Sequence, residues 1–179
     1  MDPVLSWTFA LALSIIFASS AAMKFADIAE FTTALEDYRI LPTPLVIPAG
    51  WAIPLLEAAG ALGLVANRTR PAAALLLAVL VAAFSAAIAI NLARGRRQID
   101  CGCFGPALRQ ALSGWLVARN FMLIVAAIAV AIPADARPIG AIGIVTISFG
   151  AVTLVLLYLS MNYLLANAPW IRELERVDG

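Results

Sequence analysis

Both cysteines of the chain lie within one short motif, Asp100-Cys101-Gly102-Cys103-Phe104-Gly105. A disulfide requires Cα atoms about 4.4–6.8 Å apart with converging Cβ vectors, and residues i and i+2 meet that distance. Gly102 allows the backbone to leave helical geometry and turn the two sulfurs towards each other. The ring closed by such a bond is small and strained, which favours thiol–disulfide exchange over a permanent structural link. The alternative interpretation is a pair of buried, inert cysteines in a loop.

Charged residues flank this motif. Arg94, Arg96 and Arg97 precede it, and Gly105-Pro106 is typical of a helix start, with proline at the first helical position. Nearby cations and a helix N-terminus stabilise a thiolate, whereas the carboxylate of Asp100 acts in the opposite direction. The pattern predicts redox chemistry at the two cysteines, supported by these neighbours in the chain: Arg94, Arg96, Arg97, Asp100, Gly102, Phe104 and Gly105.

Composition indicates a membrane protein. Hydrophobic residues make up 63% of the 179 residues and the mean hydropathy is +0.96, which is too apolar for a soluble domain. The net charge of +1 gives no electrostatic support for nucleic-acid binding. The chain contains no histidine, which removes the commonest metal ligand and general base. Two cysteines alone make a poor zinc site, so no metal is expected.

The apolar segments predict an all-α fold, a bundle of transmembrane helices forming a single membrane domain over residues 1–179. Each predicted span is long enough to cross a bilayer at a rise of about 1.5 Å per residue. These spans cover approximately residues 4–22, 49–66, 71–93, 115–132 and 139–166. The first has no basic residue before its apolar run, unlike a signal peptide, so we expect it to be retained.

Two shorter segments have a different character. Residues 24–41 combine apolar residues at helical spacing with acidic ones, which predicts an amphipathic helix at the membrane surface or at the end of the bundle. Asp27 and Glu30 are spaced as in a capping box. Pro42, Pro44 and Pro48 are expected to stop any helix before the second span. Residues 106–113 are expected to form one or two turns of interfacial helix.

Polar residues inside the spans define a second candidate site, formed by Glu57, Arg119 and Asn120. A carboxylate at the depth of Glu57 needs a partner or a neutral form. We favour a structural hydrogen bond between helices over proton transfer for Glu57, because it lies several turns from the cysteine end. Near it, small residues allow neighbouring helices to approach closely: Ala58, Ala59, Gly60 and Gly63.

Five spans place the cysteine motif on the same side of the membrane as the amphipathic helix and the C-terminal tail. Lys24 and Asn91 belong near that face and complete the supporting residues, and Arg119 and Asn120 lie near it as well. Nine of the 12 basic residues fall on this side, and the positive-inside rule would place them in the cytoplasm. Disulfide chemistry on exported proteins instead belongs in the periplasm. We expect the periplasmic face, because several of these arginines can serve the chemistry.

Several of these residues stand in recognisable strings: Lys24 after the first span, Tyr38-Arg39-Ile40-Leu41-Pro42, Glu57, and Asn91-Leu92-Ala93-Arg94-Gly95 running into Asp100-Cys101-Gly102-Cys103-Phe104-Gly105. In these strings the chain resembles the family of the methylamine utilisation protein MauE, a relative of the DoxX-like membrane proteins. The resemblance covers roughly residues 4–130, and the cysteine string is its most specific part. It implies a four-helix DoxX-like core plus a fifth span in the bacterial inner membrane. It also implies a part in maturing methylamine dehydrogenase, whose small subunit is exported and rich in disulfides, alongside a thioredoxin-like periplasmic partner.

Two classes of function follow. The first is a membrane thiol–disulfide redox protein that forms disulfides in exported proteins, with Cys101 and Cys103 as its catalytic residues. The sequence holds no second cysteine pair for an internal relay, and no cofactor is evident, so a quinone or another protein is the expected final acceptor. The alternative is a carrier for a small solute, with Lys24, Glu57 and Asn91 along a polar path. A non-catalytic assembly scaffold is a third possibility.

Overall fold

The computed structural model describes residues 2–102, 110–133 and 138–177, and helices make up most of these ranges. Five of the described helices are long and apolar enough to cross a membrane. They are α1 (Pro3–Ala26), α3 (Thr43–Leu64), α4 (Arg70–Ala93), α5 (Gly114–Ala131) and α6 (Ala141–Val177). A sixth, α2 (Ile28–Asp37), is short and amphipathic. The predicted fold class, a polytopic helical membrane protein, is confirmed.

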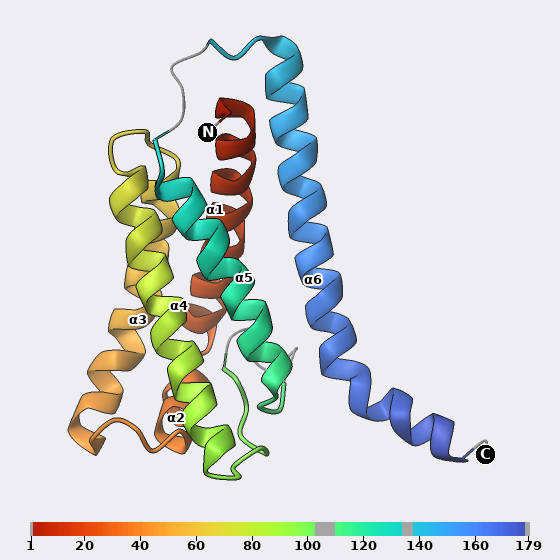
Figure 1. The fold of residues 1–179 in the computed structure, drawn as a ribbon. Coiled ribbons are helices and arrows are strands. Elements are labelled where there is room, and N and C mark those ends of the chain that lie inside the picture. The colour runs from red at the N-terminus through yellow and green to blue at the C-terminus, as the bar shows by residue number, and fades with distance from the viewer. Residues whose placement is uncertain (1, 103–109, 134–137, 178–179) are drawn as a thin grey trace.

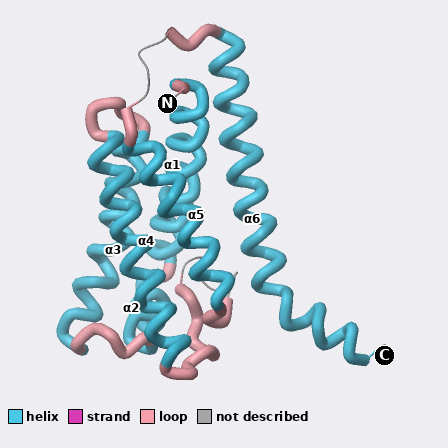
Figure 2. The backbone as a smooth tube through the Cα atoms, viewed as in Figure 1, coloured by secondary structure: helices cyan, strands magenta, loops and turns pink. Residues whose placement is uncertain are grey.

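The first four long helices form a bundle, in which α1 packs on α3 and α5, and α4 packs on α3 and α5. The last helix, α6, stands beside this bundle and packs against α1 (Figure 1). Short α2, the end of α4 and the C-terminal end of α6 lie at one end of the molecule. The start of α1, the turn after α3, the end of α5 and the start of α6 lie at the other (Figures 1 and 2). This arrangement is the one expected from five spans.

The interior of the bundle is an apolar core with large side chains from each of its helices. Leu13 and Phe17 of α1 meet Leu64 of α3, Leu77 of α4 and Val130 of α5. The outward faces of the same helices remain apolar and exposed, as a lipid-facing surface requires. Only 6% of the spanning window of α6 is buried, so that helix contributes little to the core.

The start of α3 differs from the prediction. This helix begins at Thr43 and contains Pro48, so the expectation that the prolines there would stop any helix was wrong. Pro44 lies in the first turn, where a backbone N–H has no intrahelical partner to lose. Packing supports the turns around Pro48, because Val46 lies in a buried cluster with Phe31 and Leu35 of α2.

Helix α2 confirms the predicted amphipathic element with narrower bounds. Asp27 is its N-cap and accepts a hydrogen bond of 2.9 Å from the backbone N–H of Glu30. Phe31 and Leu35 form its buried face. Lys24, which the prediction placed in this segment, instead lies in the last turn of α1.

The segment before α5 is not helical where the structure describes it. Asp100 and Ala111 form an isolated antiparallel bridge, and Ser113 is extended. The predicted interfacial helix over residues 106–113 is therefore wrong for residues 110–113, and the remainder of it lies outside the described residues. Backbone pairing of this segment with Asp100 and Cys101 takes the place of the local helical hydrogen bonds that the prediction assumed.

Candidate functional site

The cysteine motif is held against the end of the bundle by backbone pairing. The N–H of Cys101 donates to the carbonyl of Gln110 at 2.9 Å, and the N–H of Leu112 donates to the carbonyl of Ile99 at 3.2 Å. Cys101 is 2% exposed and packs in an apolar cluster with residues of α4 and α5. Gly102 has φ +69°, the left-handed conformation that glycine adopts without strain. The predicted departure from helical geometry is confirmed.

The remaining residues of the motif, Cys103, Phe104 and Gly105, lie outside the described residues. Asp100 acts within the motif: its Oδ1 accepts from the N–H of Gly102 at 3.2 Å and from the N–H of Gln110 at 3.4 Å. The carboxylate of Asp100 therefore holds the turn at Gly102.

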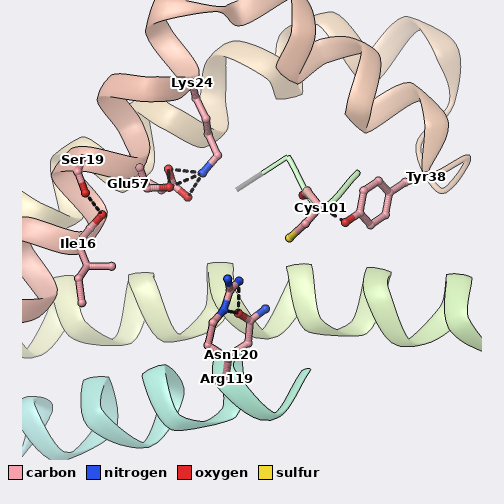
Figure 3. A network of polar contacts seen from close by, with 9 residues as sticks. Ile16, Ser19, Lys24, Tyr38, Glu57, Cys101, Arg119 and Asn120 are labelled. Carbon is pink, nitrogen blue, oxygen red and sulfur yellow. Dashed lines mark hydrogen bonds and ion pairs between the residues drawn. The ribbon is translucent and has the colours of Figure 1, made fainter. Parts of the chain in front are cut away.

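Tyr38, at the C-terminal end of α2, links the motif to α4. Its hydroxyl donates to the carbonyl of Cys101 at 3.3 Å, as Figure 3 shows. The side-chain amide of Asn91 donates to the carbonyl of Tyr38 at 3.2 Å, and Arg96 Nη1 donates to Asn91 Oδ1 at 3.2 Å. Asn91 and Arg96, both predicted as supporting residues, therefore reach the motif through Tyr38.

A second set of contacts ties the motif to α5 and α6. Arg119 Nη1 donates to Gln110 Oε1 at 3.4 Å and also to Asn162 Oδ1. The side-chain amide of Gln110 donates to the carbonyl of Asn162 at 2.8 Å. Arg119 additionally binds Asn120 Oδ1 through its Nε at 3.3 Å and its Nη2 at 3.0 Å. Arg119 and Asn120 are thus connected to Cys101 through Gln110, because the backbone carbonyl of Gln110 accepts the hydrogen bond from the N–H of Cys101.

Sequence reasoning missed three residues of this site: Tyr38, Gln110 and Asn162. Tyr38 was noticed only as an apolar residue of the amphipathic segment and as part of a family string. Asn162 interrupts the apolar run of the fifth span and is 0% exposed. An amide inside a span was the available signal, because such residues face the bundle interior and find polar partners. Nothing in the local sequence of Gln110 indicated its contacts.

Lys24 and Glu57 form a buried ion pair between α1 and α3. Lys24 Nζ lies 2.6 Å from Glu57 Oε1 and 2.7 Å from Glu57 Oε2 (Figure 3). Ser20, one turn before Lys24, accepts from Nζ at 2.7 Å and donates to Glu57 Oε2 at 3.3 Å. Lys24 is 3% exposed and Glu57 4%. The aromatic rings of Phe31 and Phe84 lie 5.3 and 5.7 Å from the ammonium. The sequence predicted that a carboxylate at the depth of Glu57 needs a partner, and that partner is the Lys24 ammonium.

Two cavities meet at Lys24. The larger, about 150 Å³, is open and has Asp100 and Gly102 of the motif in its wall together with Lys24. The same wall carries acidic residues at and in α2: Asp27, Glu30 and Asp37. The smaller cavity, about 40 Å³, lies between the Lys24–Glu57 pair and the group of Arg119 and Asn120. The two polar sites predicted separately from the sequence are therefore neighbours around these cavities.

A third hollow has a different character. It is an apolar groove of about 220 Å³ between α2, α3 and α4. Tyr38 and Ala87 line it and also belong to the cluster that packs around Cys101. Among the described residues, no group of three or more His, Cys, Asp or Glu side chains could hold a metal ion.

Comparisons with known proteins match one protein family over most of the chain. Residues 2–133 match the family model of the methylamine utilisation protein MauE. A protein of that name from Paracoccus denitrificans is 37% identical over 170 residues, covering 92% of this chain and 89% of the relative. A MauE from Methylophilus methylotrophus is 31% identical over 180 residues, covering 99% of this chain and 95% of the relative.

A third relative, the MauE of Methylorubrum extorquens, is 37% identical over 159 residues, with 88% of this chain and 86% of the relative covered. No solved structure matches the chain. The family model covers more than half of the chain, and each of these relatives exceeds 30% identity over most of its length. The chain is therefore a member of the methylamine utilisation protein MauE family.

Proposed function

We propose that this protein is a membrane thiol–disulfide redox protein, and that Cys101 and Cys103 form disulfides in exported proteins. Membership of the MauE family supports a role in methylamine utilisation. The substrate that we propose is the exported small subunit of methylamine dehydrogenase. The observation that carries the mechanism is the placement of the motif. Cys101 and Gly102 are held by a defined set of contacts at the end of the bundle, and Gly102 borders an open cavity.

The reaction is an exchange between dithiols and disulfides. A thiolate of the substrate attacks the Cys101–Cys103 disulfide, and a mixed disulfide forms as that bond breaks. The second substrate thiolate then displaces the cysteine of this protein. The substrate loses two electrons and two protons to form its disulfide, and Cys101 and Cys103 gain them as thiols.

Reoxidation of the two thiols requires an acceptor of two electrons. A thioredoxin-like periplasmic protein in its disulfide form can accept them by the same exchange in reverse. A quinone is the second acceptor class, and the apolar groove that shares Tyr38 and Ala87 with the Cys101 cluster supports a membrane-soluble molecule near the motif. We place the protein in the bacterial inner membrane, since its five apolar helices fit a multi-pass protein and its substrates are exported.

A small-solute carrier is the second candidate, favoured by the buried Lys24–Glu57 pair and the two cavities that meet there. In such a carrier the cysteines are dispensable. In an exchanger they are essential, because no other side chain of this protein can form the mixed disulfide.

The test uses Cys101→Ser and Cys103→Ser, singly and together, in a strain that depends on this protein. We expect each variant to abolish disulfide formation in the exported substrate, measured by alkylation of its thiols. Gly114→Ala is a matched control, since a Cβ at that position meets no atom within 4 Å. Membrane levels of every variant are measured by immunoblot. A double serine variant at normal level that still matures the substrate refutes the exchanger and favours the carrier or an assembly scaffold.

A further inference from the structure

We propose that Gln110, Arg119 and Asn162 are positioning residues that keep Cys101 buried, so that a partner thiolate reaches its sulfur only when their contacts open. These three residues form a polar node between the cysteine motif, α5 and α6. The inference rests on the proposed function, because access to the sulfur matters for activity only if Cys101 takes part in exchange. It also gives α6, which lies outside the matched family model, a part in the site.

Cys101 is held at both backbone groups and covered around its side chain. Its N–H donates to the carbonyl of Gln110 at 2.9 Å, and its carbonyl accepts from the hydroxyl of Tyr38 at 3.3 Å. The side chain packs in the apolar cluster with residues of α4 and α5, and Cys101 is 2% exposed. In Figure 3 its sulfur points toward the side of the site that carries Arg119. A thiolate from outside reaches a sulfur in this position only after the motif opens locally.

Gln110 resists that opening, because it bonds to Cys101 through its backbone and to two helices through its side chain. Its Nε2 donates to the carbonyl of Asn162 at 2.8 Å, and its Oε1 accepts from Arg119 Nη1 at 3.4 Å. Gln110 is 5% exposed, although it precedes α5 and lies outside any helix. Moving Cys101 away from the bundle therefore breaks either the backbone pairing of Gln110 or its side-chain contacts.

Arg119 joins Gln110 to α6. Its Nη1 donates to Asn162 Oδ1 as well as to Gln110, and its guanidinium lies 5.8 Å from the centre of the Tyr158 ring. Tyr158 and Asn162 are four residues apart in α6, so they lie on one face of that helix. Arg119 is 2% exposed and Asn162 0%, whereas only 6% of the spanning window of α6 is buried. The node is therefore a defined attachment of α6 at the end of the bundle that carries the motif.

The burial of its polar groups makes the node hard to open. A buried donor or acceptor that loses its partner costs more free energy than the hydrogen bond itself contributes. Contacts in a buried network also support one another, so the loss of one contact weakens the others. Asn162 therefore acts on Cys101 through Gln110, although Asn162 and Cys101 lie 61 positions apart in the chain.

The experiment measures the reactivity of Cys101 alone, in a full-length Cys103→Ser protein purified in detergent. Maleimide labelling is followed in the native protein and in sodium dodecyl sulfate, which gives the rate of the exposed thiol. We expect native labelling to be roughly a hundredfold slower than that rate, as for a group that reacts only through local opening. Asn162→Leu and Gln110→Leu, each added to this parent protein, should raise the native rate about tenfold, because each leaves buried polar groups unsatisfied. Asn162→Asp keeps an acceptor for Arg119 and should label at close to the parent rate.

Asn167→Leu is the matched control. Asn167 also lies in α6, and its side chain donates to a carbonyl four residues earlier at 2.8 Å, as that of Asn162 does at 2.7 Å. Within the described part of the chain, Asn167 makes no hydrogen bond to the motif, so its replacement should leave the labelling rate unchanged. The double variant Gln110→Leu with Asn162→Leu should label no faster than Gln110→Leu alone, because the two residues act through one set of contacts. All rates are measured below the melting transition of each variant, determined by circular dichroism.

Three results would overturn the positioning role. In the first, Asn162→Leu labels at the parent rate; in the second, the parent labels as fast in its native state as in sodium dodecyl sulfate. In the third, Asn162→Asp labels as fast as Asn162→Leu, which would assign the effect to packing instead of to the hydrogen bonds of the node. The proposed function fails in a separate measurement. A wild-type protein whose two thiols form no disulfide in oxidising buffer refutes the exchange but leaves the protection of Cys101 intact.

Discussion

At the residue scale, the cysteine motif has both a buried cation and exposed cations as neighbours. Lys24 is buried and shares a cavity wall with Gly102, whereas Arg94 and Arg97 are exposed. Arg96 is partly buried and bonds to Asn91. The sequence predicted that nearby arginines would favour a thiolate and placed Lys24 near the same face. The structure adds that Lys24, 77 positions before Cys101 in the chain, lines a cavity together with Gly102.

Replacing Arg94, Arg96 and Arg97 together by glutamine should slow alkylation of the motif near neutral pH. The physical reason is the loss of three positive charges that stabilise the thiolate. Because exposed charges are screened over about 10 Å at 0.1 M salt, the effect should shrink as ionic strength rises. Maleimide labelling from pH 6 to pH 9 at two salt concentrations measures it. Arg68→Gln, in the exposed turn after α3, is the control. An unchanged rate–pH profile would mean that these arginines serve topology alone.

At the scale of helices, close approach of α3 and α4 organises the bundle. A Cβ added at Gly63 would lie 2.7 Å from the Cβ of Ala73, and one at Gly60 would lie 2.6 Å from the side chain of Leu77. The expectation that small residues here permit close packing is therefore confirmed. Leu77 can rotate away from an added atom, whereas the Cβ of Ala73 can move only with its backbone.

Gly63→Val should therefore destabilise the protein by about 1–3 kcal/mol, the usual range for overpacking. Thermal unfolding in detergent, followed by circular dichroism, measures the change. Gly114→Val is the matched control, because a Cβ there meets no atom within 4 Å. Equal melting temperatures for the two variants would contradict the close contact between α3 and α4.

Helices were more predictable than the contacts between them. Long apolar runs determine the spans, and Asp27 determines the start of α2 through a local cap. The early start of α3 depends on packing against α2. A prediction from the helix-breaking tendency of Pro48 alone does not take this packing into account. The pairing of Cys101 with Gln110 closes a loop between residues nine positions apart, and no local pattern indicated it. The contact of Gln110 with Asn162 joins segments 52 residues apart and was equally out of reach.

On the scale of the whole molecule, the five long helices bring three segments to one end. These are α2, the cysteine motif and the C-terminus (Figure 1). The polar groups predicted as two separate sites meet there, around cavities that share Lys24. The side of the membrane that this end faces decides which proteins the motif can reach.

The proposed function predicts that this end faces the periplasm. Alkaline phosphatase fused after Gly179 should be active, because it folds only in an oxidising compartment. The same reporter inserted after Arg68, in the turn at the opposite end, should be inactive. The reverse pattern would place the motif in the cytoplasm, as the excess of arginines on that side suggests. Exported proteins could not then be its direct substrates.

The proposed function depends on a disulfide between Cys101 and Cys103 that exchanges readily. Its most direct test equilibrates the purified protein with mixtures of reduced and oxidised dithiothreitol or glutathione at graded potentials. Free thiols are then trapped with a maleimide that adds mass, and the gel shift is compared with that of Cys103→Ser. We predict a single two-electron transition in which both thiols appear together under mildly reducing conditions. A pair that stays reduced in oxidising buffer, or that resists strong reductant, would show that this motif does not exchange disulfides.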